Sequence, residues 1–139
     1  MTYRPRLMID FDGTLAEDAW PAMGNPNPGA VDAMKELSTV AELYVYTSRI
    51  APVYMDEVTE KNYELEIRKL RMWLDDNSLG FMHIWDKPWK PMGVAYVDDK
   101  AVRYSGRRNA WRALTPQLMA RCGEAIRDYE YGIEDAPDI

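Results

Sequence analysis

Two aspartates in the pentapeptide Asp10–Thr14 are the residues of this chain whose types and spacing best suit chemistry. They follow the short apolar run Leu7–Ile9, which predicts a strand. Side chains of a strand alternate between its faces, so Asp10 and Asp12 are expected on one face, where their charges repel. The arrangement becomes favourable if a cation lies between them or if one carboxyl stays protonated. An ordinary turn at Asp12-Gly13 explains the same residues equally well.

Polar groups also follow three further apolar runs of the chain directly. If these runs form parallel strands, their carboxyl ends meet at one edge of the sheet, where open α/β sheets bind ligands. The groups expected there, beside the two aspartates, are Thr47-Ser48-Arg49, Asp86-Lys87-Pro88 and Asp98-Asp99-Lys100. Each group alone is explained by a helix cap, an exposed turn or a surface lysine. Together they predict a site with three or more carboxylates, a hydroxyl and a lysine.

The hydrophobic pattern predicts the elements that must position these groups. Strands are expected at residues 6–11, 41–47, 81–85 and 93–97, with a short fifth strand at 102–104. Helices are expected at residues 28–38 and over a longer stretch that ends near residue 76. The apolar face of the longer helix consists of Tyr63, Ile67, Leu70 and Leu74. Caps are predicted at Asn27-Pro28 for the first helix and at Thr115-Pro116 for the last.

Strands that alternate with helices predict an α/β fold. We expect a three-layer Rossmann-like architecture, with a mostly parallel sheet and helices on both faces. A chain of 139 residues, with 47% hydrophobic and 29% charged residues, suits a single domain. That domain is expected to span residues 1–139, with a core over about residues 6–131 and an acidic C-terminal tail at 132–139.

Composition excludes several kinds of site. One cysteine, Cys122, excludes an internal disulfide, and one histidine, His83, excludes a site built from several histidines. No apolar run approaches the roughly 18 residues that span a membrane, and none follows the N-terminal residues, so we expect a cytoplasmic protein without a membrane partner. The net charge of −6 makes nucleic acid an unfavoured partner without excluding it. A local basic cluster consists of Arg103, Arg107, Arg108 and Arg112.

Phosphoryl transfer is the chemistry that the expected groups suit. Mg²⁺ takes hard oxygen ligands and usually uses one or two protein carboxylates together with phosphate and water. A carboxylate can attack phosphorus and form an aspartyl-phosphate. A lysine and hydroxyl or amide donors stabilise the charge of the transferred group. A second carboxyl can protonate the leaving oxygen and then activate water.

The chain resembles the haloacid dehalogenase-like (HAD) superfamily of aspartate-nucleophile phosphatases. The resemblance rests on an apolar strand followed by Asp-x-Asp-Gly-Thr, a second apolar strand that ends in threonine, a later lysine, and an acidic pair after another apolar strand. The matching residues are Asp10–Thr14, Thr47, Lys87 and Asp98-Asp99, and the resemblance covers residues 6 to about 105. The chain also resembles small, largely uncharacterised phosphatase-like proteins of bacteria and their phages.

The resemblance implies a Mg²⁺-dependent phosphomonoester hydrolase that works through an aspartyl-phosphate. Asp10 would be the nucleophile, Asp12 the general acid/base, and Lys87 would neutralise the phosphate and the phospho-aspartate. Lys90 and Lys100 are alternatives to Lys87. The implied metal site consists of Asp10, the backbone carbonyl of Asp12, Asp98 and Asp99, with the direct ligand of the last pair left open. The implied phosphate-binding residues are Gly13, Thr47, Ser48 and Lys87.

A large cap domain is not expected, because the loop between Leu15 and the first helix is too short to hold one. The resemblance therefore implies a capless or minimally capped form with an open site. Such forms act on bulky substrates or use a neighbouring subunit as a lid, so a homo-oligomer is one expected assembly. Two alternatives stay open: a nucleic-acid end-processing phosphatase, and a non-catalytic HAD-fold protein that binds a metal or a partner.

Overall fold

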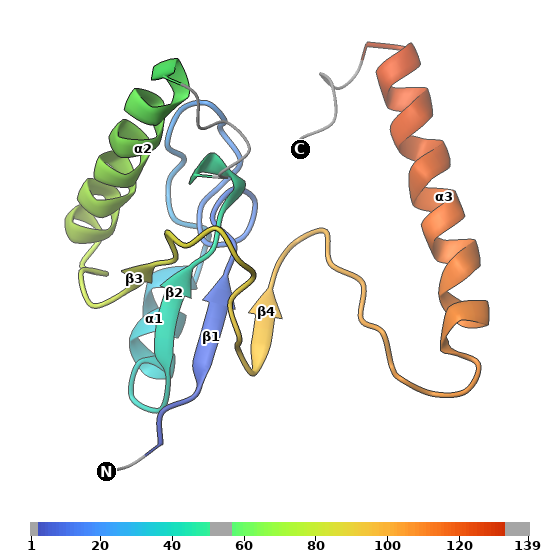
Figure 1. Cartoon of the computed structure of the whole chain (residues 1–139), viewed down its shortest axis with the longest axis horizontal. Helices are drawn as coiled ribbons and strands as arrows, with labels where there is room; N and C mark the ends of the chain where they lie inside the picture. Colours follow the sequence, from blue (N-terminus) through green and yellow to red (C-terminus); the bar gives the residue numbers. More distant parts are fainter. Residues whose placement is uncertain (1–2, 51–56, 133–139) are drawn as a thin grey trace. The chain divides into compact units, whose positions relative to one another are not determined.

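The computed structural model describes residues 3–50 and 57–132, which fall into two compact units, Met1–Ala101 and Val102–Ile139 (Figure 1). The first unit holds a sheet and two α-helices, and the second holds one long helix. The single domain expected over residues 1–139 stays a prediction, and its acidic tail lies outside the described residues beyond Gly132. Within the described ranges, no helix has both the length and the apolar composition that crossing a membrane requires.

A parallel sheet of four strands forms the centre of the first unit, in the order β3-β2-β1-β4. Its strands are β1 (Arg6–Ile9), β2 (Glu42–Val45), β3 (His83–Ile84) and β4 (Ala95–Val97). Ile9 lies opposite Val45 on one side and Val97 on the other, so β1, β2 and β4 end level with one another. The sheet confirms the predicted α/β fold with parallel strands.

The strands are shorter than the apolar runs that predicted them. Phe11 continues the first run, but it lies in the turn after β1, where its ring is fully buried. A run of apolar residues thus reports burial more than strand pairing. The fifth strand predicted at residues 102–104 is wrong, because these residues form no ladder. The ring of Tyr104 instead contacts Trp111, with the ring centroids 5.4 Å apart.

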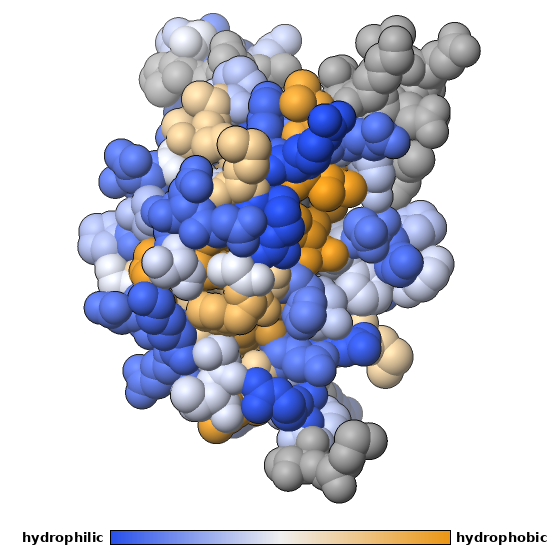
Figure 2. All heavy atoms as spheres, turned by 90° about the vertical axis from the view of Figure 1, so that its left-hand side faces the viewer, coloured by the Kyte–Doolittle hydropathy of each residue, from blue (hydrophilic) through white to orange (hydrophobic). Residues whose placement is uncertain are grey.

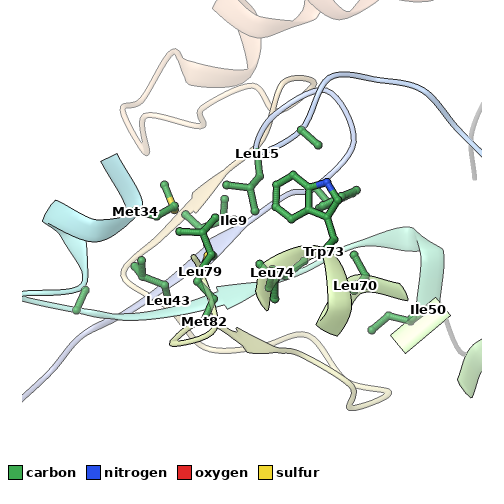
Figure 3. Close-up of a cluster of buried hydrophobic side chains, with 14 residues drawn as sticks. Ile9, Leu15, Met34, Leu43, Ile50, Leu70, Trp73, Leu74, Leu79 and Met82 are labelled. Atoms are coloured by element: carbon green, nitrogen blue, oxygen red, sulfur yellow. The ribbon is translucent and has the colours of Figure 1, made fainter. Parts of the chain in front are cut away.

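Helices α1 (Ala30–Leu37) and α2 (Glu57–Asp76) pack into one hydrophobic cluster on one face of the sheet (Figure 3). Met34 of α1 and Leu74 of α2 join Val45 of β2 in this cluster. Leu70 and Leu74 are fully buried, which confirms the predicted amphipathic helix. Hydrophilic side chains cover much of the molecular face on the side of α2 (Figure 2).

The opposite face of the sheet is covered in part by the connection between β3 and β4, which crosses it without a helix (Figure 1). Pro91 of this connection is fully buried, as is Met8 of β1. Tyr96 of β4 donates its hydroxyl to the carbonyl of Pro91 and holds the connection there. A helix on this second face, as the three-layer architecture requires, stays a prediction.

The start of α1 differs from the predicted cap. The helix begins at Ala30, after Gly29 in the left-handed conformation with φ 80°, and no side chain caps it. The predicted cap, Asn27, instead donates its side-chain amide to the carbonyl of Thr14 at 2.9 Å. The asparagine therefore fastens the loop before the helix to the turn that follows β1.

The second unit consists mainly of α3 (Ala110–Glu130). The predicted start at Thr115-Pro116 is wrong, because the helix begins earlier and Pro116 lies inside it. A proline there removes one backbone donor, and the Thr115 hydroxyl donates to the carbonyl of Trp111 at 2.7 Å in the same turn. Favourable helix residues such as Ala110 and Ala113 extend the helix ahead of the proline.

Candidate functional site

The strand order places the ends of β1 and β4 at a topological switch point. From β1 the chain moves outward to β2 and β3 and then crosses back to β4 on the other side of β1. Ligands in open α/β sheets bind in the crevice that such a reversal leaves beyond the carboxyl ends. Asp10 follows β1 there, with its backbone N–H bonded to the carbonyl of Val97 at 2.9 Å. Asp98 and Asp99 follow β4 directly.

Three carboxylates converge at this point. Asp10, Asp98 and Asp99 each offer an oxygen, and these atoms lie within 4.8 Å of one another. Asp10 is half-buried, whereas Asp98 and Asp99 are exposed. The sequence predicted this convergence from the strand ends alone.

The electrostatics of the cluster favour a cation. Burial raises the pKa of Asp10 to about 7, and the charges of Asp98 and Asp99 add to the rise. The Thr14 hydroxyl, which donates to Asp10 Oδ2 at 3.2 Å, and the backbone N–H of Phe11 act in the opposite direction. A cation among the three carboxylates would remove the repulsion, and this set of hard oxygen donors fits Mg²⁺.

Gly13 gives Asp99 the room to approach. Its φ is +81°, and a Cβ atom at this position would lie 2.6 Å from Asp99 Oδ2. The Gly13 backbone N–H, predicted to face a phosphate, donates to the carbonyl of Ala16 at 2.9 Å. In this structure Gly13 therefore closes the turn after β1 and leaves space for the Asp99 carboxylate.

Asp12 is held by Arg49, a residue to which the sequence assigned no role. Arg49 Nε donates to Asp12 Oδ2 at 2.7 Å, and Nη2 donates to Oδ1 at 2.6 Å. The Arg49 side chain is fully buried. Its burial alone would lower the pKa of the guanidinium, but the carboxylates of Asp12 and Glu66 outweigh this effect and raise it. The structure thus keeps the Asp12 side chain in an ion pair outside the three-carboxylate cluster.

The remaining predicted residues have separate surroundings. The Thr47 hydroxyl is nearly buried and accepts a bond from the backbone N–H of Arg49 at 3.3 Å, while Ser48 is exposed. Lys87 is about half exposed and lies 3.8 Å from Asp86 Oδ1. Lys90 Nζ lies 5.0 Å from the ring centroid of Tyr96. The phosphate-binding role that the resemblance implies for Lys87 stays a prediction.

Hydrogen bonds of three side chains hold the loop between Leu15 and α1 next to the site. Arg49 donates to the carbonyls of Pro21 and Ala22 at 3.1 and 2.6 Å. Trp73 of α2 donates its buried indole N–H to the carbonyl of Gly24 at 2.7 Å. Asn27 binds the turn after β1, as described for the start of α1. Side chains from β2's end, from α2 and from the loop itself hold this segment beside Asp12.

Comparisons with known proteins identify no family for this chain. One similar solved structure is that of a conserved protein from Bacteroides thetaiotaomicron, with a TM-score of 0.49 and 22% sequence identity. The match covers 86% of this chain and 93% of that chain. No family model matches the sequence, and no curated protein matches it.

Proposed function

We propose that the protein is a Mg²⁺-dependent phosphomonoester hydrolase that works through an aspartyl-phosphate on Asp10. The resemblance of its motifs to the HAD superfamily implies this activity. The observation that supports it best is the convergence of Asp10, Asp98 and Asp99 at the topological switch point of the sheet. Like charges this close are unfavourable without a cation, and a half-buried carboxylate among them is suited to nucleophilic attack on a metal-bound phosphate.

The oxygens of Asp10, Asp98 and Asp99 would hold the cation. When bound, Mg²⁺ neutralises charge on the phosphate and orients it for in-line displacement. Asp10 is fixed for attack, because its backbone is bonded to β4 and its carboxylate accepts the Thr14 hydroxyl. Thr47, which follows β2, would donate its hydroxyl to the phosphate, while its oxygen accepts the backbone N–H of Arg49 at 3.3 Å.

The reaction would proceed in two displacements. An Asp10 oxygen attacks phosphorus, the bond from phosphorus to the leaving oxygen breaks, and its electron pair moves to that oxygen, which takes a proton from Asp12. Water then attacks the phosphorus of the aspartyl-phosphate, gives a proton to Asp12, and releases phosphate and the free Asp10 carboxylate. Both Asp12 oxygens accept bonds from Arg49 in the described conformation. Asp12 must therefore take up a proton from solvent and exchange at least one of these bonds for the leaving oxygen before it acts as the donor.

Turnover of an aryl phosphate tests this proposal directly. We expect hydrolysis in Mg²⁺, its loss on chelation with EDTA, and its loss in Asp10→Asn, which keeps the shape of the side chain but removes the nucleophile. Asp76→Asn, which alters an exposed carboxylate at the end of α2, is the matched control and should keep full activity. Turnover that survives Asp10→Asn would refute the mechanism. Tight Mg²⁺ binding without turnover across a broad panel of phosphate esters would favour the non-catalytic alternative.

A nucleic-acid end-processing phosphatase is the second candidate, and the charge distribution favours it. Residues 102–123 contain five arginines and no acidic residue, so the rest of the chain carries a net charge of −11. Tyr104 and Trp111 are exposed and contact each other in the same segment. Exposed aromatic rings among arginines suit stacking and phosphate contacts with a single strand.

Phosphorylated oligonucleotides separate the two candidates. If the second holds, 5′- or 3′-phosphorylated single strands should be turned over with a lower KM than a small aryl phosphate. Replacing Arg107 and Arg108 together by glutamine should raise that KM, while turnover of the aryl phosphate stays unchanged. Equal KM values for wild type and variant on oligonucleotides would exclude a role for these arginines.

A further inference from the structure

Arg49 has no donor left for a ligand. A guanidinium carries five N–H donors in a fixed planar arrangement. Nε and one N–H of Nη2 bind the two oxygens of Asp12, and the second N–H of Nη2 binds the carbonyl of Ala22. Nη1 binds the carbonyl of Pro21 and Glu66 Oε2, at 3.1 and 3.4 Å. Arg49 follows Thr47-Ser48 at the end of β2, but its donors are all taken by the protein itself.

The position of the guanidinium is fixed by more than its hydrogen bonds. Its carbon lies 5.4 Å from the ring centroid of Phe11 and 4.8 Å from that of Trp20. Phe11 is fully buried, whereas the Trp20 side chain is 54% exposed and belongs to the loop beside the site. A buried arginine that lost these partners would carry an uncompensated charge, so the arrangement is strongly specified.

One guanidinium therefore joins Asp12 to the loop. Nη2 donates to both Asp12 Oδ1 and the carbonyl of Ala22, so one nitrogen atom binds the carboxylate and the loop. Two parallel bonds also fix the plane of the carboxyl group. If the leaving oxygen replaces one of them, the other keeps the carboxyl in place.

We propose that Arg49 is a positioning residue that orients Asp12 for proton transfer to the leaving group and couples this orientation to the loop at Trp20–Ala22. The inference rests on the proposed function, because it concerns the proton donor of that reaction. It assigns Arg49 no contact with phosphate. It also gives the loop a role in place of a cap domain, since a substrate that contacts the loop acts on Asp12 through one side chain.

Leaving-group dependence separates this role from a merely structural one. An alkyl phosphate expels a strongly basic alkoxide and needs a proton from Asp12 as the bond to phosphorus breaks. A nitrophenyl phosphate expels a stable phenolate and needs little protonation. A residue that orients the proton donor matters for the first substrate and hardly for the second, whereas general damage to the fold lowers both rates together.

The experiment compares kcat/KM on the two substrates, which reports the first displacement and not the later hydrolysis of the aspartyl-phosphate that both substrates share. It uses the full chain with Arg49→Lys, which keeps the charge but cannot form two parallel bonds. We expect kcat/KM on the alkyl phosphate to fall roughly 10²-fold, the lower end of what a general acid contributes, with a much smaller change in kcat/KM on nitrophenyl phosphate. Arg71→Lys is the matched control, because Arg71 also donates to two backbone carbonyls, those of Met82 and Gly80, but does not touch Asp12. It should leave the ratio of the two rates unchanged. Equal losses on both substrates, or no loss in a folded variant, would overturn the inference.

If the wild type hydrolyses neither substrate, the proposed function is refuted. Hydrogen exchange then still tests whether Arg49 couples Asp12 to the loop. The backbone N–H groups of Glu17 and Ala22 are bonded within the loop, to Asn25 and Ala19. We expect both amides to exchange faster in Arg49→Lys and in Asp12→Asn than in the wild type and in Arg71→Lys. Unchanged exchange in these two variants would show that Arg49 does not couple Asp12 to the loop.

Discussion

Gly13 is the residue whose substitution tests the geometry of the acidic cluster most directly. Alanine at φ +81° costs about 1 kcal/mol in backbone strain, and its Cβ would also displace Asp99. We expect Gly13→Ala to lower turnover by roughly 10²-fold, because small displacements of reacting groups have effects of this size. Mg²⁺ affinity, measured by calorimetry, should fall as well.

Gly29 provides a matched control for this substitution. Its φ is +80°, almost that of Gly13, but nothing lies within 4 Å of the position where a Cβ would stand. Gly29→Ala should therefore show a similar loss in the free energy of unfolding and leave Mg²⁺ affinity and turnover unchanged. Parallel losses of activity in both variants would mean that strain, and not the room needed by Asp99, accounts for the effect.

The raised pKa of Asp10 predicts how stability depends on pH in the metal-free protein. Folding raises this pKa from 3.8 to about 7, so the folded state favours the protonated carboxyl. The resulting stability is fully present below about pH 4 and is lost as the pH rises through 7. Urea unfolding in EDTA should show that the stability of the wild type falls relative to that of Asp10→Asn between about pH 4 and 7. A difference that is constant over this range would contradict the prediction.

The sequence predicted the site residues whose positions follow from the ends of parallel strands. It did not predict the role of a residue whose buried partners come from distant segments. Asp10, Asp98 and Asp99 were expected together, because parallel strands bring their carboxyl ends to one edge. Arg49 follows a strand in the same way, but its partners come from the loop, from α2 and from the turn after β1. No local pattern encodes contacts among segments so far apart in the sequence. The predicted role of Lys87 also stays a prediction, because its described contact is with Asp86.

At the scale of elements, the sequence predicted the order of strands and helices and misplaced several boundaries. Periodicity and apolar runs indicate which side chains are buried, and each strand or helix has such a buried set. The patterns therefore give the order of the elements but not the residues at which they begin and end. Whether a polar residue caps a helix depends on the other hydrogen-bond partners within its reach. Asn27 binds the carbonyl of Thr14 and leaves α1 without a side-chain cap, and Pro116 lies within α3 although its type favours a helix start.

The contact between α2 and the loop predicts the effect of a single indole N–H. Trp73→Phe keeps a ring in the core but leaves the buried carbonyl of Gly24 without its donor. We expect a loss of about 1–3 kcal/mol in the free energy of unfolding and lower turnover, because the loop also binds Arg49. Chemical denaturation and aryl phosphate hydrolysis measure the two effects.

Tyr63→Phe is the control for this prediction. The Tyr63 hydroxyl donates to the carbonyl of Asp86 at 2.9 Å in an exposed position, where water can replace it. Its loss should cost less than about 1 kcal/mol and leave turnover unchanged. A larger loss in Tyr63→Phe than in Trp73→Phe would mean that the buried bond does not hold the loop.

At the scale of the whole first unit, the site depends on a strand order that no local pattern encodes. The reversal between β3 and β4 puts Asp98 and Asp99 beside Asp10, although almost ninety residues separate them along the chain. The register of β4 on β1 determines how close they come, since Ile9 lies opposite Val97. The fold therefore holds three carboxyl groups together, and they repel one another wherever they are ionised and no cation lies between them.

This repulsion predicts that Asp99→Asn stabilises the protein without Mg²⁺ and destabilises it, relative to the wild type, when Mg²⁺ is bound. Asp99→Asn removes a charge that repels Asp10, so in EDTA the variant should unfold at a higher urea concentration than the wild type. In Mg²⁺ the order should reverse, because a ligand present at 100 times its Kd stabilises the wild type by about 2.7 kcal/mol and the variant binds it less well. Asp76 is exposed and is not one of the three carboxylates of the cluster, so Asp76→Asn should shift the midpoint equally in both conditions. If Asp99→Asn is destabilised in EDTA as much as in Mg²⁺, the three carboxylates do not form a cation site.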